Sequence, residues 1–338
     1  METRSIIGKR NVWIGCAMIW IVLYHAKFDV ASKIFNFISS IGYGGVDVCI
    51  FASGIGCYYS LKGSSDACQF LKRRFLRLAP TYWCFLPFWI VFQKMTSEIS
   101  LRGAFGNFLG LEYITNKGEA FNWYITLILM LYIIAPYLKQ IIDQLDKKKE
   151  TLLVLAFIIG SFAFWESKTY IIIFTRIPLF IMGMCLAKRC SNNCKISKKA
   201  FAFFSIVSIM GIISLKFVLE MFYEYLWSYG LYWYPFVIIT PGLCMLVSLS
   251  FKYMERYKGV RWIEKIISII AGYSFEIYLI HIPIFEYAHE IIEEFSLFHY
   301  KNLILLSCLG LTIVGCFLLR NISGLFLRVC KELKRLYV

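Results

Sequence analysis

Long apolar runs follow one another along almost the whole chain, and this feature limits what the chain can fold into. A run of about 17 to 25 mostly apolar residues is long enough to cross the hydrocarbon core of a bilayer as a helix. The sequence predicts about ten helical spans, near residues 12–27, 42–61, 77–94, 121–138, 151–165, 170–187, 200–219, 229–250, 266–286 and 302–319. Several of these runs are short or carry a polar residue, and we expect the fifth and sixth spans to be tilted or broken.

The composition agrees with an all-α integral membrane protein. Charged residues make up 17% of the chain, below the roughly 25% of soluble domains, and 59% of the residues are hydrophobic. A net charge of +15 suggests a nucleic-acid partner in a soluble protein, but here the basic residues lie in short loops between apolar runs. We therefore expect membrane lipids with anionic headgroups as partners, and no nucleic acid.

The distribution of Lys and Arg predicts the topology, because basic residues near the ends of spans are retained in the cytoplasm. If the N-terminus is inside, the cytoplasmic segments hold 27 of the 36 Lys and Arg residues, the opposite loops hold eight, and Arg176 lies within a span. Both termini are then cytoplasmic, in a multi-pass protein of the inner or plasma membrane. The first apolar run lacks a persuasive cleavage site, so we interpret it as an uncleaved helix.

The chain shows no Pro- or Ser-rich linker and no long soluble insert, so residues 1–338 are expected to form a single membrane domain. Its twelve cysteines lie within spans or on the predicted cytoplasmic side, where thiols stay reduced. Cys190 and Cys194 form a C-x3-C pair, but no His or further Cys nearby completes a tetrahedral metal site. We expect free thiols and no metal.

Ionisable side chains within spans are candidate functional residues, because insertion of Asp, Lys or Arg at a helix centre costs about 2.5 to 3.5 kcal/mol. His25 ends the run "IGCAMIWIVLYHA", and Asp29 lies four residues later, within reach if the helix continues past residue 27. A carboxylate there would orient the imidazole and support it as a general base. The alternative, an interfacial histidine beside a loop aspartate, stays open.

Two more candidates allow a structural and a functional interpretation. Asp47 lies in "GYGGVDVCIFASG", where small residues favour tight helix packing. Its carboxylate either makes a polar contact that holds packed helices together or belongs to a functional site. Arg176, in "TRIPLFIMG", either binds an anionic group or pairs with Asp47, and pairing is the simpler interpretation.

The segment "AGYSFEIYLIHIP" carries a third group of polar residues. Helical spacing puts Ser274, Tyr278 and His281 on one face, whereas Glu276 lies about 140° away from His281 around the axis. An acid/base site and a buried structural network both fit this spacing.

The segment "FLKRRFLRLAP" places four basic residues before an apolar span. The charge bias alone explains Lys72 and Arg73 as anchors. Arg74 and Arg77 share one face if the helix has already begun. Pro80 leaves open a later helix start, with both arginines in a loop.

Together these segments resemble the acyltransferase 3 family of integral membrane acyltransferases. The resemblance covers nearly the whole chain, and its six motifs occur in order. They are "NVWIGCAMIWIVLYHA", "GGVDVCIFASG", "FLKRRFLRLAP", "NWYITLILMLYIIAP", "RIPLFIMGMCLA" and "SFEIYLIH". The resemblance implies an enzyme that moves an acyl group, usually acetyl, from cytoplasmic acyl-CoA to a hydroxyl of an extracytoplasmic glycan or other cell-envelope acceptor.

The resemblance also implies roles for individual residues. The family's first-helix histidine matches His25 as the catalytic candidate, and its R-x-x-R motif, associated with the donor, matches Arg74 and Arg77. Its G-V-D element matches Asp47, and its Tyr-Leu-x-His element matches Tyr278 and His281. The chain departs from the family in two respects. Many members carry Arg or Lys where this chain has Ile14, and the nearest basic residue here is Arg10, four residues earlier. Some members also place a Glu after the fourth-helix Trp, and "NWYITLILMLY" lacks it.

These matches predict a mechanism in which Arg74 and Arg77 bind the CoA phosphates and His25 deprotonates the acceptor hydroxyl. Asp29 or Asp47 would orient the histidine, and an acyl-histidine intermediate is an open alternative. The expected substrate-binding residues are Trp123, Arg176, Tyr278, His281 and Glu276. A transporter or flippase for a lipid-linked glycan, and a structural or sensory membrane protein, are the competing interpretations.

Overall fold

The computed structural model describes residues 3–63, 66–96, 101–115, 122–164 and 167–336, which form helices and no strands. The first half contains α1 (Thr3–Ile7), α2 (Arg10–Ala26), α3 (Lys33–Ser40), η1 (Gly42–Gly44), α4 (Gly45–Lys62), α5 (Ala67–Thr96), α6 (Leu101–Leu109), α7 (Glu112–Thr115) and α8 (Trp123–Gln144). The second half contains α9 (Lys147–Ser161), η2 (Phe162–Phe164), α10 (Lys168–Phe174), α11 (Ile177–Ser191), α12 (Lys198–Ser228), η3 (Leu231–Trp233), α13 (Tyr234–Met254), α14 (Lys258–Gly272), α15 (Ser274–Glu294), η4 (Phe298–Tyr300) and α16 (Lys301–Leu336).

Six helices in the described ranges are long and apolar enough to cross a membrane, or up to eight if each of two bent helix pairs forms one span. The chain is therefore a multi-pass membrane protein, but the predicted count of ten is not confirmed. The first and fifth predicted spans correspond to α2, of 17 residues, and α9, of 15 residues. At 1.5 Å per residue these helices are about 26 and 22 Å long, shorter than a hydrocarbon core of about 30 Å.

One predicted span contains a turn and another is bent. The sixth has a turn at Thr175 and Arg176, between α10 and α11, but Tyr170–Ser191 still forms one candidate span of 22 residues, so the expected break is not confirmed. The ninth, predicted over 266–286, is not a single straight helix, because α14 and α15 meet at Tyr273 with a bend of 74°. α14 exposes Trp262 and carries three basic residues in fifteen, a pattern typical of a helix that lies along the membrane interface.

The centre of the molecule depends on close contact between α4 and α11. A methyl group added to Gly54 would lie 2.1 Å from the backbone oxygen of Phe180, and one added to Gly183 would lie 2.2 Å from that of Phe51. The two backbones thus approach through small residues on both helices, as helices often do in bilayers. The interpretation of the α4 glycines as a packing surface is confirmed.

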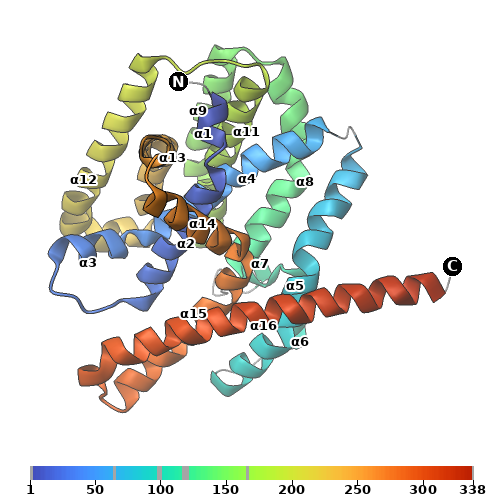
Figure 1. The fold of residues 1–338 in the computed structure, drawn as a ribbon, viewed down its shortest axis with the longest axis vertical. Coiled ribbons are helices and arrows are strands. Elements are labelled where there is room, and N and C mark those ends of the chain that lie inside the picture. Colours follow the sequence, from blue (N-terminus) through green and yellow to red (C-terminus); the bar gives the residue numbers. More distant parts are fainter. Residues whose placement is uncertain (1–2, 64–65, 97–100, 116–121, 165–166, 337–338) are drawn as a thin grey trace.

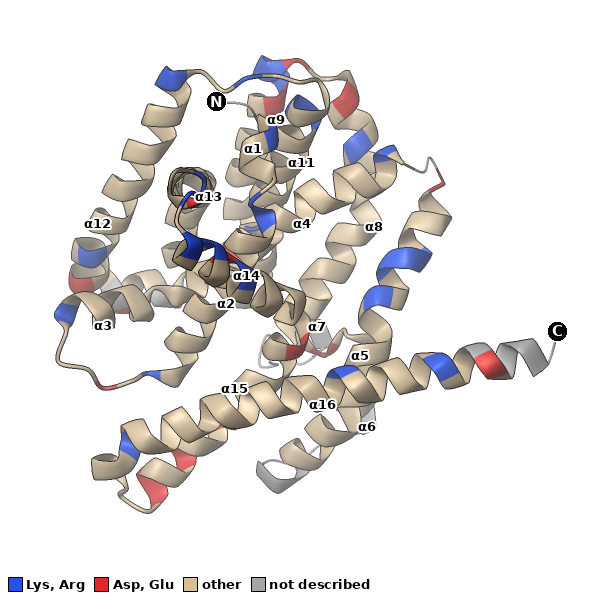
Figure 2. Ribbon diagram, in the orientation of Figure 1, with Lys and Arg blue, Asp and Glu red and all other residues tan. Residues whose placement is uncertain are grey.

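The remaining helices surround this centre unevenly (Figure 1). α15 and α16 form an antiparallel pair along the lower side, and α16 continues past α5 towards the C-terminus. α12 stands at the left margin of Figure 1, where it packs mainly on α13. Figure 2 shows basic segments at the upper edge, around the ends of α8 and α11. The cytoplasmic location of the two termini stays a prediction.

We expect Gly54→Ala to lower the thermal unfolding midpoint in detergent, because the new methyl group overlaps the α11 backbone. Overpacking of this kind costs about 1 to 3 kcal/mol. Gly310→Ala on α16 is the matched control, since nothing lies within 4 Å of the added methyl group. Equal midpoints for the two variants would contradict the central role of the α4–α11 contact.

Candidate functional site

Three arginines from two helices converge beside α4. α5 runs unbroken through Pro80, so Arg74 and Arg77 lie on a helix, and the alternative of a loop is wrong. Arg74 donates from Nη2 to the backbone oxygen of Gly56 at 2.7 Å. A methyl group on Gly56 would lie 2.9 Å from Nη1 of Arg10 and 3.9 Å from Nη2 of Arg74. Arg10, at the start of α2, therefore joins the two arginines of the R-x-x-R motif.

These three arginines, of which Arg10 and Arg74 are half-buried and Arg77 is exposed, differ from several other cations of the structure in having no carboxylate partner among the described residues. Ion pairs within the described residues join Lys9 to Glu264, Arg176 to Asp47, Lys188 and Arg189 to Glu150, and Arg320 to Glu276. None of the described ion pairs includes Arg10, Arg74 or Arg77. Like charges held together without a counter-ion repel, so the cluster is suited to an anionic ligand.

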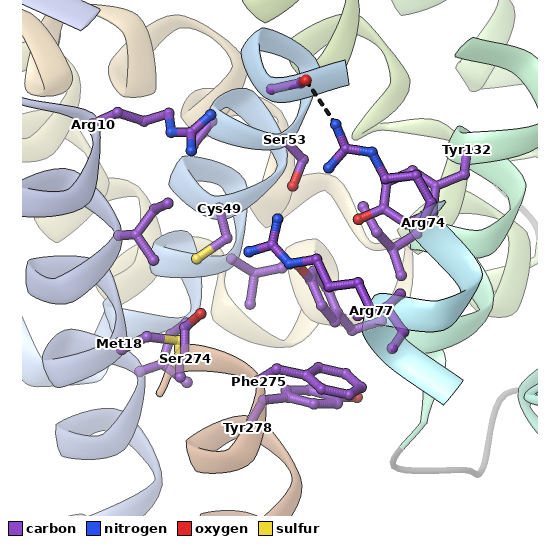
Figure 3. A pocket seen from close by; sticks show the side chains of 18 residues that line it. Arg10, Met18, Cys49, Ser53, Arg74, Arg77, Tyr132, Ser274, Phe275 and Tyr278 are labelled. Carbon is purple, nitrogen blue, oxygen red and sulfur yellow. Dashed lines mark hydrogen bonds between the residues drawn. The ribbon is translucent and has the colours of Figure 1, made fainter. Parts of the chain in front are cut away.

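The arginine cluster forms one end of a cavity of about 100 Å³ between α2, α4, α5, α8 and α15. Figure 3 shows Arg10, Arg74 and Arg77 directed into this space, with Ser274, Phe275 and Tyr278 at its other end. The walls between the two ends are mostly apolar. They include Ile14, Met18, Ile21, Val46, Cys49, Ala52, Leu78 and Ile128, with Ser53, Tyr124 and Tyr132 as polar additions.

Two histidines lie beside the far end of this cavity. The ring centroids of His25 and His281 are 5.1 Å apart, and Tyr278, which lines the cavity, lies 6.5 Å from His281. Nδ1 of His281 lies 2.6 Å from the Ile277 backbone oxygen, which can only accept, so Nδ1 carries the proton. In the neutral ring Nε2 of His281 is then unprotonated, and it is buried without a hydrogen-bond partner among the described residues. The α15 face predicted from the spacing thus meets the end of α2.

Neither aspartate proposed to orient His25 makes a hydrogen bond to its ring within the described residues. α2 ends at Ala26 and Lys27 is left-handed, with φ of 50°, so Asp29 is not one helical turn beyond His25. The Asp29 backbone instead exchanges two hydrogen bonds with Asn302, at 3.0 and 2.7 Å. His289 contacts α2 from the other side, with Nε2 3.0 Å from the His25 backbone oxygen.

Asp47 belongs to a second buried cluster around Arg176. Nε of Arg176 lies 3.7 Å from Oδ1 of Asp47, and both side chains are buried. The guanidinium lies 4.9 Å from the ring centroids of both Trp123 and Trp233, so it stacks between two indoles. The turn between α10 and α11 contains Arg176, and its Nη1 donates to the Ile172 backbone oxygen at 2.7 Å. Pairing with Asp47, the simpler interpretation of Arg176, matches this arrangement.

Glu276 lies away from both clusters. It accepts from Nε and Nη2 of Arg320 at 2.8 and 2.9 Å and so links α15 to α16. Arg320 also donates to Gly272 and lies over the ring of Tyr273, at the bend between α14 and α15. Glu276, a predicted substrate-binding residue, thus links two helices through Arg320 and does not line the cavity.

The sequence did not identify Tyr124, Trp233 or His289 as members of these clusters. Their residue types are common in apolar helices, and only tertiary contact distinguishes them. Arg10 had a partial signal, because it lies one helical turn before Ile14, the position that is basic in many family members.

The comparison with protein families found a match between the acyltransferase domain and residues 13–321, nearly the whole chain. The resemblance seen in the six ordered motifs is therefore confirmed. Arg10 lies just before the matched range. Searches of curated proteins and of solved structures gave no match.

We expect Arg176→Gln to lower the thermal unfolding midpoint strongly, because it leaves the buried Asp47 carboxylate without a counter-charge. Removing one partner of a buried pair typically costs about 3 to 5 kcal/mol. The double variant Asp47→Asn/Arg176→Gln should recover part of this loss. If the double variant is as unstable as the sum of the two single variants, the pair is not coupled.

Proposed function

The chain belongs to the acyltransferase family and is a membrane acyltransferase, and we propose that it moves an acetyl group from cytoplasmic acyl-CoA to a hydroxyl of an extracytoplasmic glycan or other cell-envelope acceptor. The observation that carries this proposal is the cavity with unpaired arginines at one end and Tyr278, beside the His25–His281 pair, at the other. Such a cavity suits a donor with an anionic head and a reactive end.

The proposal that CoA is the donor is based on the positive charge of the three arginines. CoA carries several phosphate groups, and the planar guanidinium of arginine presents paired donors that match phosphate oxygens. Arg10, Arg74 and Arg77 lack carboxylate partners in the described chain, so phosphates would supply the missing counter-charge. Arg10 would take the place of the basic residue that many relatives carry at the position of Ile14.

The proposal of a short acyl group is based on the size and lining of the cavity. Its volume of about 100 Å³ and its bulky lining favour a short acyl group such as acetyl over a long chain. Apolar walls would also exclude water from the thioester, which limits its hydrolysis.

The histidine pair supplies the acid/base chemistry in this proposal. His25 takes the proton of the acceptor hydroxyl while the oxygen attacks the thioester carbonyl carbon. The carbon–sulfur bond then breaks, CoA leaves as a thiolate, and the proton passes from His25 to the sulfur. His281, whose Nε2 is unprotonated, would hold His25 or accept its proton. The products are an acyl ester and free CoA.

We expect His25→Ala to lower acetyl transfer by about 100-fold or more, the usual contribution of a general base. The assay measures the transfer of labelled acetyl groups from acetyl-CoA to envelope glycans, in membranes that contain the purified variant. Mass spectrometry of those glycans identifies the acetylated acceptor. Transfer at the wild-type rate would refute the role of His25.

We expect Arg10→Ala, Arg74→Ala and Arg77→Ala each to raise the KM for acetyl-CoA by roughly tenfold, as lost charge-assisted hydrogen bonds predict. Lys72→Ala and Arg73→Ala are the matched controls, because both residues precede the same motif and neither lines the cavity. If the controls raise the KM as much as the cavity arginines, general membrane charge and not this cluster binds the donor.

A further inference from the structure

Two spaces outside the proposed active site share α3 and α12 as walls. The first is an apolar cavity of about 340 Å³, which lies between α2, α3, α4, α12 and α13. Trp20, Ile38, Ile41 and Ile212 are among its lining residues, and its surface is almost free of polar atoms. An apolar cavity of this size suits hydrocarbon better than water.

The second space is a pocket of about 440 Å³ between the same two helices, where Phe37 and Leu219 supply apolar surface beside charged and hydrogen-bonding side chains. α3 contributes Lys33, Asn36 and Ser40, and α12 contributes Lys216 and Glu220. Neither lysine forms an ion pair in the part of the chain that the structure describes. Two cations against one carboxylate leave the pocket with a net positive charge.

The two spaces are lined by neighbouring residues of the same two helices. Ile212 lines the apolar cavity and Lys216, one helical turn later on α12, lines the pocket. On α3 the spacing of Lys33, Asn36 and Ser40 puts the pocket residues on one face of the helix, and Ile38 lines the cavity from an adjacent face. Figure 1 shows α3 beside the lower part of α12. The pair of spaces therefore combines an apolar cavity with a pocket of net positive charge.

α12 places these spaces beside the bilayer. It is one of the helices long and apolar enough to cross a membrane, and Ile213 and Phe217 on it are exposed. Side chains next to the two spaces thus face lipid, so a molecule that enters the groove comes from the membrane.

We propose that the groove between α3 and α12 binds a phosphate-bearing lipid, with the phosphate at Lys33 and Lys216 and one hydrocarbon chain in the apolar cavity. The phosphate of such a lipid matches the charge of the two lysines, and its hydrocarbon chain matches the apolar cavity. The inference stands on these two spaces and does not depend on the proposed acyl transfer.

The test measures binding of phosphatidylglycerol to the purified full chain in detergent, by native mass spectrometry and by the rise in thermal midpoint. The double variant Lys33→Ala/Lys216→Ala should bind it at least about tenfold more weakly, since a lysine near a lipid phosphate contributes about fivefold. Ile212→Trp, which fills the cavity, should also weaken binding. Lys301→Ala is the matched control, because Lys301, like Lys33, is the first residue of a helix on the same predicted side and does not line either space.

Three results would overturn the proposal. The double variant and Ile212→Trp could bind the lipid as wild type does, phosphatidylcholine could bind as tightly as phosphatidylglycerol, or inorganic phosphate alone could raise the midpoint equally. Thermal midpoints without added lipid establish that each variant is folded, and an unfolded Ile212→Trp is replaced by the smaller change Ile212→Phe.

Discussion

The contact between the backbones of α4 and α11 positions both clusters of the candidate site. α4 can approach α11 at Gly54 because neither helix has a side chain at the point of contact. The same helix presents Asp47 to Arg176 at its beginning, and further along it presents Cys49, Ser53 and Gly56 to the cavity. A side chain at Gly56 would meet Arg10, so small residues on α4 serve both helix packing and the meeting of the arginines.

Charge compensation separates structural from functional cations in this interior. The buried Arg176 lies near the Asp47 carboxylate and two indole rings, and Arg320 is hydrogen-bonded to Glu276, so each of these cations has a carboxylate counter-charge within the protein. The arginines of the cavity have backbone and aromatic contacts, such as those of Arg74 with Gly56 and Tyr132, but no carboxylate in the described chain. A partly buried cation without a counter-charge, such as Arg10 or Arg74, is costly, and a bound anion lowers that cost. This difference is the physical basis for the proposal that the donor binds in this cavity.

Sequence patterns predicted the residue types of the site better than their partners. The R-x-x-R spacing on a helix predicted a shared face for Arg74 and Arg77, and the spacing of Ser274, Tyr278 and His281 predicted the face that meets α2. The expected link from Asp29 to His25 failed because the helix ends at Ala26, which depends on how the following loop packs against α16. The count of ten spans is not confirmed, because hydropathy alone does not distinguish a helix that crosses the membrane from one that is short or bent.

The sequence by itself determined an all-helical membrane protein of the acyltransferase family, because apolar runs, loop charges and ordered motifs are local properties of the chain. Only the tertiary structure decided which charges are paired. The pairs Asp47–Arg176 and Glu276–Arg320 join helices far apart in sequence, and so does the group of Arg10, Arg74 and Arg77, which has no carboxylate partner in the described part of the chain. Periodicity gives the face that a residue occupies on its own helix, whereas the facing helix is set by packing between distant segments.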